Sequence, residues 1–336
     1  MSLPLPGPVL VMGAGSVGCY IGGQLLGAGA DVHFVARPRV LQALREHGLT
    51  VTDLDGGRAH MPATALQVHG SVPAGLVPAL VLLCVKTGAT AQAAAELAAA
   101  VPAGTPVLSL QNGVANAEVG AAAAPTLAWL PGMVPFNIAE LGPGHFHRGT
   151  TGPLAAQAAP ALQPWVAVFQ AAGLRLKLHD DLRPVQWGKL LLNLNNPVNA
   201  LSGLPLRAEL LDRDCRVVFA TLQQEALAAL RAAGITPAQM TALRPERLPL
   251  VLRLPNWLFT RVASRMLRID EKARSSMADD LALRRPTEVD AICGAVVRLA
   301  QAHGLQAPRC SQMVSLLSVP EPVPLGGRGL RRALGL

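Results

Sequence analysis

The stretch PVLVMGAGSVG, residues 8–18, decides the fold of the first part of the chain. It begins as an apolar run of the kind found in strands that are buried on both faces. Residues 19–29 continue with helical spacing, and Gly13, Gly15 and Gly18 between the two segments fit the pattern G-x-G-x-x-G. In this pattern one glycine permits a tight turn, one lets the backbone approach a pyrophosphate, and one lets the helix pack closely on the strand. We therefore predict a strand, a turn and a helix that together bind a dinucleotide.

The cofactor prediction extends to the start of this helix and to the end of the next strand. Phosphate oxygens would bind the amides of Ser16 and Val17 at the helix N-terminus. The second strand ends in VHFVARPRV, which holds Arg37 and Arg39 but no acid, whereas Asp31 begins that strand and lies at the wrong end of the sheet. A guanidinium suits the 2′-phosphate of NADP, while NAD enzymes usually carry an acidic residue there. We predict NADP, bound by Arg37 ahead of Arg39; the alternative for Arg37 is a solvated loop residue.

Two further polar residues directly follow apolar strands. Lys86 ends the run PALVLLCVK, and Asn112 follows the run TPVLSLQ. Ligands of open α/β sheets bind beyond the carboxyl ends of the strands, so both residues are predicted to face the cofactor. The alternatives are a surface lysine at a strand end and a turn asparagine in Gln111-Asn112-Gly113.

The order of the segments predicts the fold class. Strands alternate with helices in the first part, which indicates a parallel sheet covered on both faces. Shorter β-like pieces between about 120 and 180 extend this pattern, and the chain is almost wholly helical after 185. We predict an α/β fold: an N-terminal Rossmann-type doubly wound sheet over residues 1–184, an all-helical C-terminal domain over 185–320, and a loose basic tail over 321–336.

Composition narrows the class of function. The 336-residue chain has a net charge of +8, which raises the question of an acidic partner. Scattered arginines and a single tyrosine argue against nucleic acid and favour a phosphorylated small molecule. Five widely spaced cysteines without a CxxC pair indicate neither disulfides nor a zinc site, and we predict no metal. No apolar run reaches the roughly 18 residues of a membrane span, and no signal segment is evident, so we predict a cytoplasmic protein with no membrane contact.

The second part of the chain holds a polar cluster inside an apolar helix, VQWGKLLLNLNNPVNALSG, residues 185–203. At 100° per residue Lys189, Asn193 and Asn196 share one face, and Pro197 kinks or opens the helix. A lysine can donate a hydrogen bond to a carbonyl oxygen and then a proton, while asparagines hold carboxylate or hydroxyl groups. The alternative is a set of hydrogen bonds between helices, with the lysine reaching to the surface.

Six motifs of the chain together carry a resemblance to a known family: GAGSVG, KT at 86–87, QNG at 111–113, W-x-K-L-L-L-N at 187–193, SSM at 275–277 and RPTEVD at 285–290. With these motifs in the right order, the chain resembles the ketopantoate reductase (2-dehydropantoate 2-reductase) family over most of its length. The last motif, followed by a helix ending in AHGLQAP, is highly specific to that family. In the family a Rossmann domain is joined to a helical domain, and the active site lies in the cleft between them.

The resemblance implies reduction of 2-dehydropantoate to pantoate with NADPH, in the pathway to pantothenate and coenzyme A. It assigns the general acid to Lys189 and the active-site glutamate to Glu288, which otherwise reads as a dipole-complementing residue at the start of a helix. Asn112 is implied on the cofactor side and in the substrate site. The other substrate-binding residues implied are Asn193, Asn196 and Ser276.

The sequence departs from the family pattern in two places. The segment between Lys189 and Asn196 is one residue shorter, and Leu206 stands where the family has an asparagine. Reduction of another 2-oxo acid and a β-hydroxyacid-type dehydrogenase therefore remain as alternatives, as does a non-catalytic NADPH-binding protein. The resemblance also leaves a homodimer open.

Overall fold

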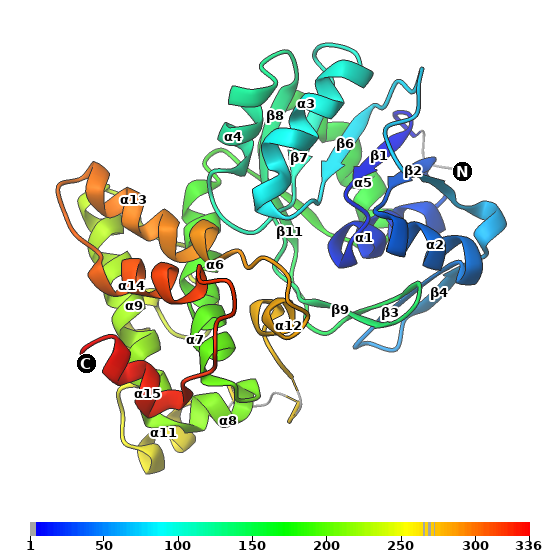
Figure 1. Ribbon diagram of the computed structural model, residues 1–336. Coiled ribbons are helices and arrows are strands. Elements are labelled where there is room, and N and C mark those ends of the chain that lie inside the picture. Colours follow the sequence, from blue (N-terminus) through cyan, green and yellow to red (C-terminus); the bar gives the residue numbers. More distant parts are fainter. Residues whose placement is uncertain (1–4, 265, 268–269, 272) are drawn as a thin grey trace. The chain divides into compact units, whose positions relative to one another are not determined.

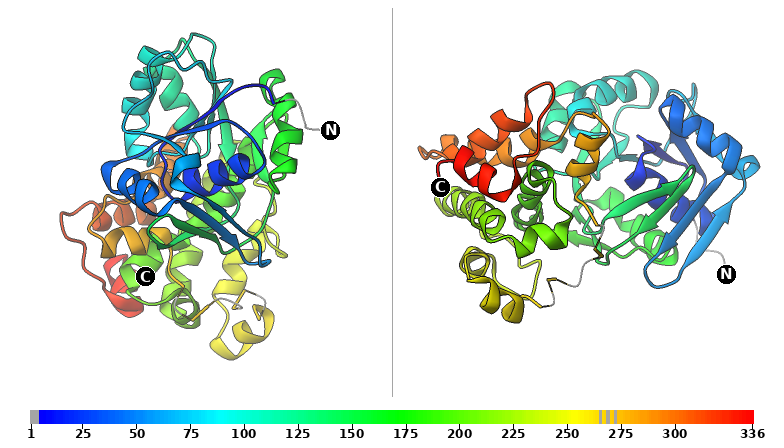
Figure 2. Two further views of the ribbon diagram at one scale, coloured as in Figure 1. Left: turned by 90° about the vertical axis from the view of Figure 1, so that its right-hand side faces the viewer. Right: turned by 60° about the horizontal axis from the view of Figure 1, so that its bottom comes forward.

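The computed structural model describes residues 5–264, 266–267, 270–271 and 273–336. The chain forms two compact units, Met1–Leu182 and Arg183–Leu336, and each is described by itself. Figure 1 and Figure 2 show strands with helices in the first unit and helices in the second. Within the described ranges no helix has the length and the apolar character needed to cross a membrane.

The first unit is built on an eight-stranded sheet in the order β12-β11-β8-β7-β6-β1-β2-β5. From β8 to β5 all neighbouring strands pair in parallel, whereas β11 runs antiparallel to β8. The chain leaves β1 on one side and returns to β6 on its other side, so the predicted doubly wound sheet is confirmed. The strands are β1 (Val9–Met12), β2 (Val32–Val35), β5 (Gln67–His69), β6 (Leu80–Leu83), β7 (Pro106–Ser109), β8 (Ala128–Met133), β11 (Leu154–Gln157) and β12 (Leu176–His179).

Helices cover both faces of this sheet because the side chains of β1 alternate between two apolar cores. Val9 and Val11 pack in the core that includes Ile21 of α1, while Leu10 and Met12 pack in the core that includes Leu97 of α3. All four β1 residues are buried, which is why the run is apolar without interruption. The helices of this unit are α1 (Ser16–Gly27), α2 (Pro38–His47), α3 (Thr90–Ala100), α4 (Asn116–Ala123) and α5 (Gln163–Ala171), with short 3-10 turns η1 (Ala63–Ala65), η2 (Thr87–Ala89) and η3 (Pro160–Leu162).

A second, four-stranded sheet in the order β4-β3-β10-β9 belongs to the same unit. Its strands are β3 (Leu49–Asp53), β4 (Arg58–Met61), β9 (Ile138–Gly142) and β10 (His145–Arg148). The strand pieces expected after residue 120 are present, but the hairpin of β3 and β4 is not among the sequence predictions. The alternation in LTVTD and the Asp-Gly pair at the turn were the signals for it.

The second unit is helical, and most of its other helices pack against the long helix α9 (Arg213–Ala232). The other helices are α6 (Arg183–Asn193), α7 (Asn195–Ser202), α8 (Leu206–Leu211), α10 (Leu248–Leu252), α11 (Asn256–Val262), α12 (Ser276–Ala282), α13 (Ala295–Ala302), α14 (Pro308–Leu317) and α15 (Gly326–Ala333), with a 3-10 turn η4 (Pro245–Arg247) and a π-helical turn η5 (Asp290–Gly294).

A fully buried arginine joins four of these helices. Arg216 of α9 donates hydrogen bonds to the carbonyl oxygens of Leu252, Leu254 and Leu210, at 2.9, 2.9 and 2.8 Å. It also donates to Asn256 Oδ1 at 2.8 Å, and its guanidinium lies 4.1 Å from the ring centre of Phe259. These carbonyls belong to the last residues of α8 and to the end of α10, where helix carbonyls lack partners of their own. Arg216 therefore satisfies helix ends that would otherwise be buried without hydrogen bonds.

The opening predicted at Pro197 is present in the structure: the helix expected over 186–202 is interrupted at Leu194, because Pro197 has no N–H to bond the carbonyl of Asn193. One prediction about this unit is corrected by the structure. The tail expected to be loose carries helix α15 instead. Leu330 of that helix is fully buried, and Arg331 forms an ion pair with Asp214 at 2.7 Å.

Candidate active site

Each glycine in the turn after β1 is explained by a different property of the structure. Gly13 has φ +100°, and a Cβ there would lie 2.6 Å from the backbone nitrogen of Val85. A Cβ on Gly18 would collide with the carbonyl oxygen of Gly13. Around Gly15, in contrast, a Cβ would meet no atom of the described residues within 4 Å. Gly13 and Gly18 therefore serve the packing of the turn, while Gly15 leaves room above it.

This room lies at the N-terminus of α1, where the geometry fits a phosphate group. Gly15 is the N-cap residue, no side chain caps the helix, and its first turn carries no acid. Amides of the first helical turn, such as those of Ser16 and Val17, have no acceptor within the helix and point outward. Together with the helix dipole they favour an anion. The predicted cofactor-binding turn is thus of a form that can hold a pyrophosphate.

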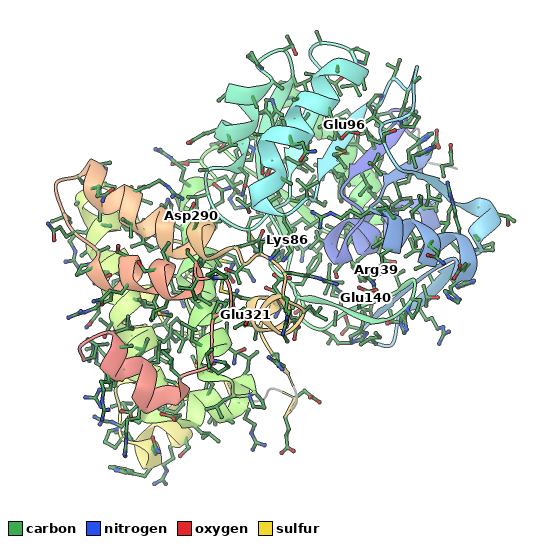
Figure 3. All side chains as sticks on the ribbon, viewed as in Figure 1. Arg39, Lys86, Glu96, Glu140, Asp290 and Glu321 are labelled. Carbon is green, nitrogen blue, oxygen red and sulfur yellow. The ribbon has the colours of Figure 1, made fainter. Side chains whose placement is uncertain are left out.

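The end of β2 lies directly beside the glycine turn. Gly13 and Ala14 donate backbone hydrogen bonds to the carbonyl oxygen of Val35, at 3.2 and 2.8 Å. Arg37 follows as the exposed N-cap residue of α2, and its side chain takes part in no ion pair among the described residues. Arg39 instead binds Glu140 through two hydrogen bonds of 2.6 and 2.7 Å. Both residues are labelled in Figure 3. Of the two arginines, Arg37 is the one that remains available to a ligand.

A buried polar network supports the loops that follow β6 and β7. Gln111 donates to the carbonyl oxygen of Val85 at 3.0 Å and to Thr90 Oγ1 at 2.7 Å. Ser109 donates to Gln111 Oε1 at 2.9 Å, and Thr90 donates to Asn116 Oδ1 at 3.3 Å. All these side chains are buried, so the two loops are held together by hydrogen bonds in the interior of the unit. Thr90 and Asn116 were not expected from the sequence, where each simply begins a helix.

The same network holds the backbone of Asn112, the residue predicted on the cofactor side, in place. The carbonyl oxygen of Asn112 accepts from Thr87 Oγ1 at 3.2 Å and from Asn116 Nδ2 at 2.7 Å. Lys86, just before Thr87, is exposed, and Asn112 is half-buried. The structure therefore brings the loops of Lys86 and Asn112 together at the carboxyl ends of neighbouring strands.

In the second unit, Lys189 and Asn193 lie on α6 at spacing i, i+4, and thus on one face of the helix. Asn193 is 9% exposed, and Lys189 is half-buried. Burial lowers the pKa of the Lys189 ammonium from 10.5 to about 8. An ammonium with this pKa is a better proton donor than an exposed lysine and is still largely charged at pH 7.

Asn196 lies on α7, beyond the break at Leu194. Its position on the face of Lys189 was calculated for one continuous helix and stays a prediction. The carbonyl oxygen of Asn196 accepts a hydrogen bond from Ser275 Oγ at 3.3 Å, and Ser275 Oγ also accepts from the amide of Ala278 at 3.2 Å. Ser275 is thus the cap of α12, and Ser276 beside it is exposed. The structure therefore places Ser276 at a helix start that is tied to α7.

Glu288 lies directly before the helical segment that begins with the π-helical turn η5. It is half-buried. Asp290 in this turn binds Arg298 at 2.9 Å and is labelled in Figure 3, and a Cβ on Gly294 would collide with the Asp290 carboxylate. Turns of this type occur frequently at functional sites because they redirect side chains. The sequence predicted a regular helix here, so the wider turn was not foreseen.

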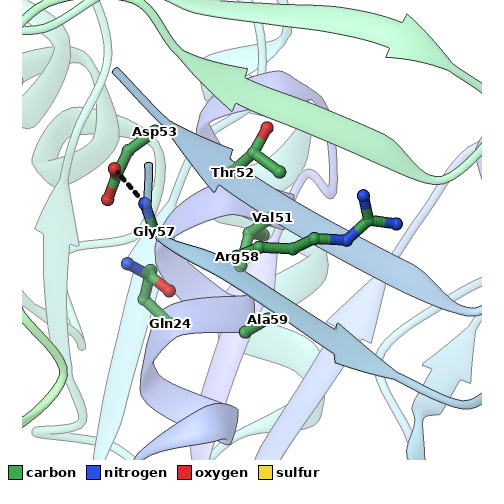
Figure 4. Close-up of a pocket in the computed structure, with 7 residues that line it drawn as sticks. All are labelled: Gln24, Val51, Thr52, Asp53, Gly57, Arg58 and Ala59. Atoms are coloured by element: carbon green, nitrogen blue, oxygen red, sulfur yellow. Dashed lines mark hydrogen bonds between the residues drawn. The ribbon is translucent and has the colours of Figure 1, made fainter. Parts of the chain in front are cut away.

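A hollow of about 120 Å³ beside the second sheet carries no comparable chemistry (Figure 4). It is lined by Gln24 of α1 and by the β3–β4 hairpin. Asp53 Oδ1 accepts from the amides of Asp55 and Gly57 at 2.9 and 2.8 Å, so this carboxylate serves the turn. No group of three or more His, Cys, Asp or Glu residues that could hold a metal ion is found in the described ranges.

Comparisons with known proteins agree with the geometry of both units. A family model described as ketopantoate reductase PanE/ApbA matches residues 9–160, and the model of that family's C-terminal part matches 181–321. A 2-dehydropantoate 2-reductase of Halobacterium salinarum is 28% identical over 321 residues, which are 93% of this chain and 98% of the relative. One of Mesorhizobium japonicum is 25% identical over 336 residues, covering 92% of this chain and 96% of the relative.

Solved structures give the same result. The crystal structure of a PanE/ApbA family ketopantoate reductase from Ralstonia eutropha JMP134 has a TM-score of 0.77 and 28% identity, covering 98% of this chain and 100% of that one. D-mandelate dehydrogenase with NADH and anilino(oxo)acetate has a TM-score of 0.75 at 17% identity, covers 98% of this chain and 100% of its own, and shares the fold. Because the two family models together match most of the sequence, the chain belongs to the ketopantoate reductase family of oxidoreductases.

Proposed function

We propose that this protein reduces 2-dehydropantoate to pantoate with NADPH, and that Lys189 is the general acid. The observation that carries the proposal is the Lys189 ammonium, with a pKa lowered to about 8 by burial, on the helix face that also presents Asn193. The relatives named 2-dehydropantoate 2-reductase support the substrate. The experiment is to follow NADPH oxidation by the purified protein with 2-dehydropantoate.

Bound NADPH would supply a hydride to the C2 carbonyl of the substrate. Lys189 would donate a hydrogen bond to the carbonyl oxygen and then transfer its proton to the oxygen as negative charge develops there. Asn193, Asn196 and Ser276 would hold the polar groups of the substrate. Glu288 would bind the substrate hydroxyl or position Lys189.

On the cofactor side, the glycine turn with Ser16 and Val17 would hold the pyrophosphate. Lys86 and Asn112 would contact the cofactor at the carboxyl ends of β6 and β7, with Asn112 keeping the nicotinamide ribose in place. The buried bonds of Gln111 and Asn116 support this role, because they fix the two loops before any ligand binds.

Replacement of Arg37 by serine tests the choice of cofactor. Loss of a charge-assisted contact to the 2′-phosphate should raise KM for NADPH by about 10-fold or more and leave KM for NADH unchanged. Arg39→Ser is the matched control, because Arg39 already binds Glu140 and should leave both constants within about twofold. An equal effect of Arg37→Ser on the two cofactors would contradict the assignment.

Replacement of Gly15 by alanine tests the phosphate site without disturbing the fold. The added methyl group meets no atom within 4 Å in the described part of the chain, and the backbone φ of −89° suits alanine, so the thermal midpoint should stay unchanged. NADPH affinity should fall by about 10-fold or more, since the methyl group occupies the space above the turn. Gly13→Ala should instead destabilise the first unit, because its φ is +100° and its Cβ would collide with Val85. Unchanged NADPH binding in Gly15→Ala would place the cofactor elsewhere.

A second candidate function is the reduction of another 2-oxo acid. Leu206, where the family has an asparagine, begins α8, and its amide donates to the carbonyl oxygen of Ala273 at 2.9 Å, two residues before Ser275. An apolar side chain there favours a substrate with a less polar end. Comparison of kcat/KM for 2-dehydropantoate with that for its analogue lacking the hydroxymethyl group, 2-oxoisovalerate, distinguishes the two functions. A homodimer remains a proposal that the molar mass in solution tests.

A further inference from the structure

A fully buried carboxyl group lies in the second unit, outside the residues so far assigned to the reaction. Glu209 of α8 is 0% exposed. Its Oε2 accepts from Asn195 Nδ2 at 3.0 Å and from Asn199 Nδ2 at 3.2 Å. Its Oε1 is buried and has no hydrogen-bond partner among the described residues. A buried acid with half of its carboxyl group unsatisfied is costly, so a reason for its presence is required.

Among the residues that the structure describes, the charges around Glu209 do not stabilise an ionised carboxylate. Asp212, at the start of α9, repels it. Arg207 of α8 binds Glu271 at 2.7 Å, and Arg274 lies 3.7 Å from Asp279. Arg216 is occupied by carbonyl oxygens. Burial above all raises the pKa of the Glu209 carboxyl to about 8, so it is largely neutral at pH 7.

Asn199 links Glu209 to the start of α12 through hydrogen bonds. Its Nδ2 donates to Glu209 Oε2 and also to the carbonyl oxygen of Leu204, at 2.8 Å. Its Oδ1 accepts from the amide of Ser275 at 2.9 Å, and Ser275 in turn donates to the carbonyl oxygen of Asn196. Asn199 is 0% exposed, so water does not compete for these bonds. One network of buried hydrogen bonds therefore joins α7, α8 and Ser275, the residue directly before α12.

We propose that Glu209 is a positioning residue for the substrate site: by orienting Asn199 it fixes the start of α12, and with it Ser276, relative to Asn196 of α7. Its role in turnover rests on the proposed function, whereas its role in holding the start of α12 does not. Glu209 touches neither Asn196 nor Ser276 through any bond described above and acts through Asn199 and Ser275.

The experiment compares Glu209→Ala, Glu209→Gln and Glu225→Ala. Glutamine reproduces a neutral acid, with an acceptor for the asparagine amides and a donor in place of the proton. Glu225 is a matched control in the same unit, because it accepts from the amides of Arg309 and Cys310 at 2.9 Å and so caps α14 rather than α12. The readouts are amide hydrogen exchange at Ser275 and Ala278, and the kinetic constants for 2-dehydropantoate.

Glu209→Ala should speed exchange at Ser275 and Ala278 by about 10-fold, the equivalent of one lost neutral hydrogen bond. It should raise KM for 2-dehydropantoate by a similar factor, with a smaller change in kcat and an unchanged KM for NADPH. Glu209→Gln should match the wild type in exchange and in KM at pH 7. Above about pH 8 the KM should rise more steeply in the wild type than in Glu209→Gln, because Lys189 loses its proton in both proteins whereas the buried carboxyl ionises only in the wild type. Glu225→Ala should lower the thermal midpoint and leave exchange at Ser275 and KM unchanged.

Exchange at Ser275 that is the same in Glu209→Ala as in the wild type would overturn the proposal. If Glu209→Ala does not fold, Glu209→Met fills the same space without an acceptor, and the same comparison applies. Because exchange requires no substrate, altered exchange without any turnover of 2-dehydropantoate would reject the proposed function and keep the positioning role.

Discussion

Lys189→Ala should lower kcat for 2-dehydropantoate by about 10²–10⁴-fold, the range that a positioned general acid contributes. The NADPH dissociation constant should stay within about twofold, because the glycine turn and Arg37 that would hold the cofactor belong to the first unit. Steady-state kinetics together with NADPH fluorescence titration measure both quantities. Comparable losses in turnover and in NADPH affinity would contradict the role of Lys189.

Two control variants sharpen this test. Lys189→Arg keeps the positive charge but has a pKa too high for efficient proton transfer, so it should bind the substrate better than Lys189→Ala and turn over nearly as slowly. Lys86→Ala removes an exposed lysine of the first unit. It should affect KM for NADPH far more than kcat.

Arg216→Ala should destabilise the second unit by about 3–5 kcal/mol, the largest stability effect that we expect from a single substitution. The variant leaves the carbonyl oxygens of Leu210, Leu252 and Leu254 buried without their donor, and removes the contact with the Phe259 ring. Lysine cannot replace it, because one ammonium does not reach three carbonyls in the directions of a guanidinium. Urea unfolding measures the loss.

Arg253→Ala is the matched control for Arg216. Arg253 binds the side chains of Thr221 and Gln224, both at 2.8 Å, and its guanidinium bonds no helix end among the described residues. We expect a loss of about 1 kcal/mol for this variant. Equal losses for the two arginines would show that Arg216 contributes no more than an ordinary hydrogen-bonding side chain.

The glycine turn could be predicted from the sequence because its requirements are local. Gly13 and Gly18 are dictated by φ and by close approach within a few residues along the chain or on the neighbouring strand. The parallel sheet could also be predicted from the sequence, since strands buried on both faces are apolar throughout. The hairpin of β3 and β4 was not, because its short, partly polar strands are completed by β10, about 90 residues later in the chain.

In the second unit, inference from spacing reaches less far. One missing N–H at Pro197 interrupts the helix between Lys189 and Asn196, so the shared face of these two residues stays a prediction. The role of Glu209 could not be predicted from the sequence, because its hydrogen-bond network includes Ser275. The amide of Ser275 bonds Asn199, which lies 76 residues earlier in the chain. The prediction of a loose tail was wrong for another reason. The glycines and arginines of the tail are typical of a loose segment, yet Leu330 and Leu334, four residues apart, are both fully buried.

The pH dependence of kcat for 2-dehydropantoate reduction at saturating NADPH and substrate tests the central claim most directly. A general acid must be protonated, so kcat should be level near pH 7 and fall as the pH rises through about 8, the lowered pKa of Lys189. The same fall in Glu209→Gln would assign it to the lysine rather than to the buried carboxyl. NADPH that is not oxidised with this substrate, or a kcat that stays level up to pH 10, would contradict the account.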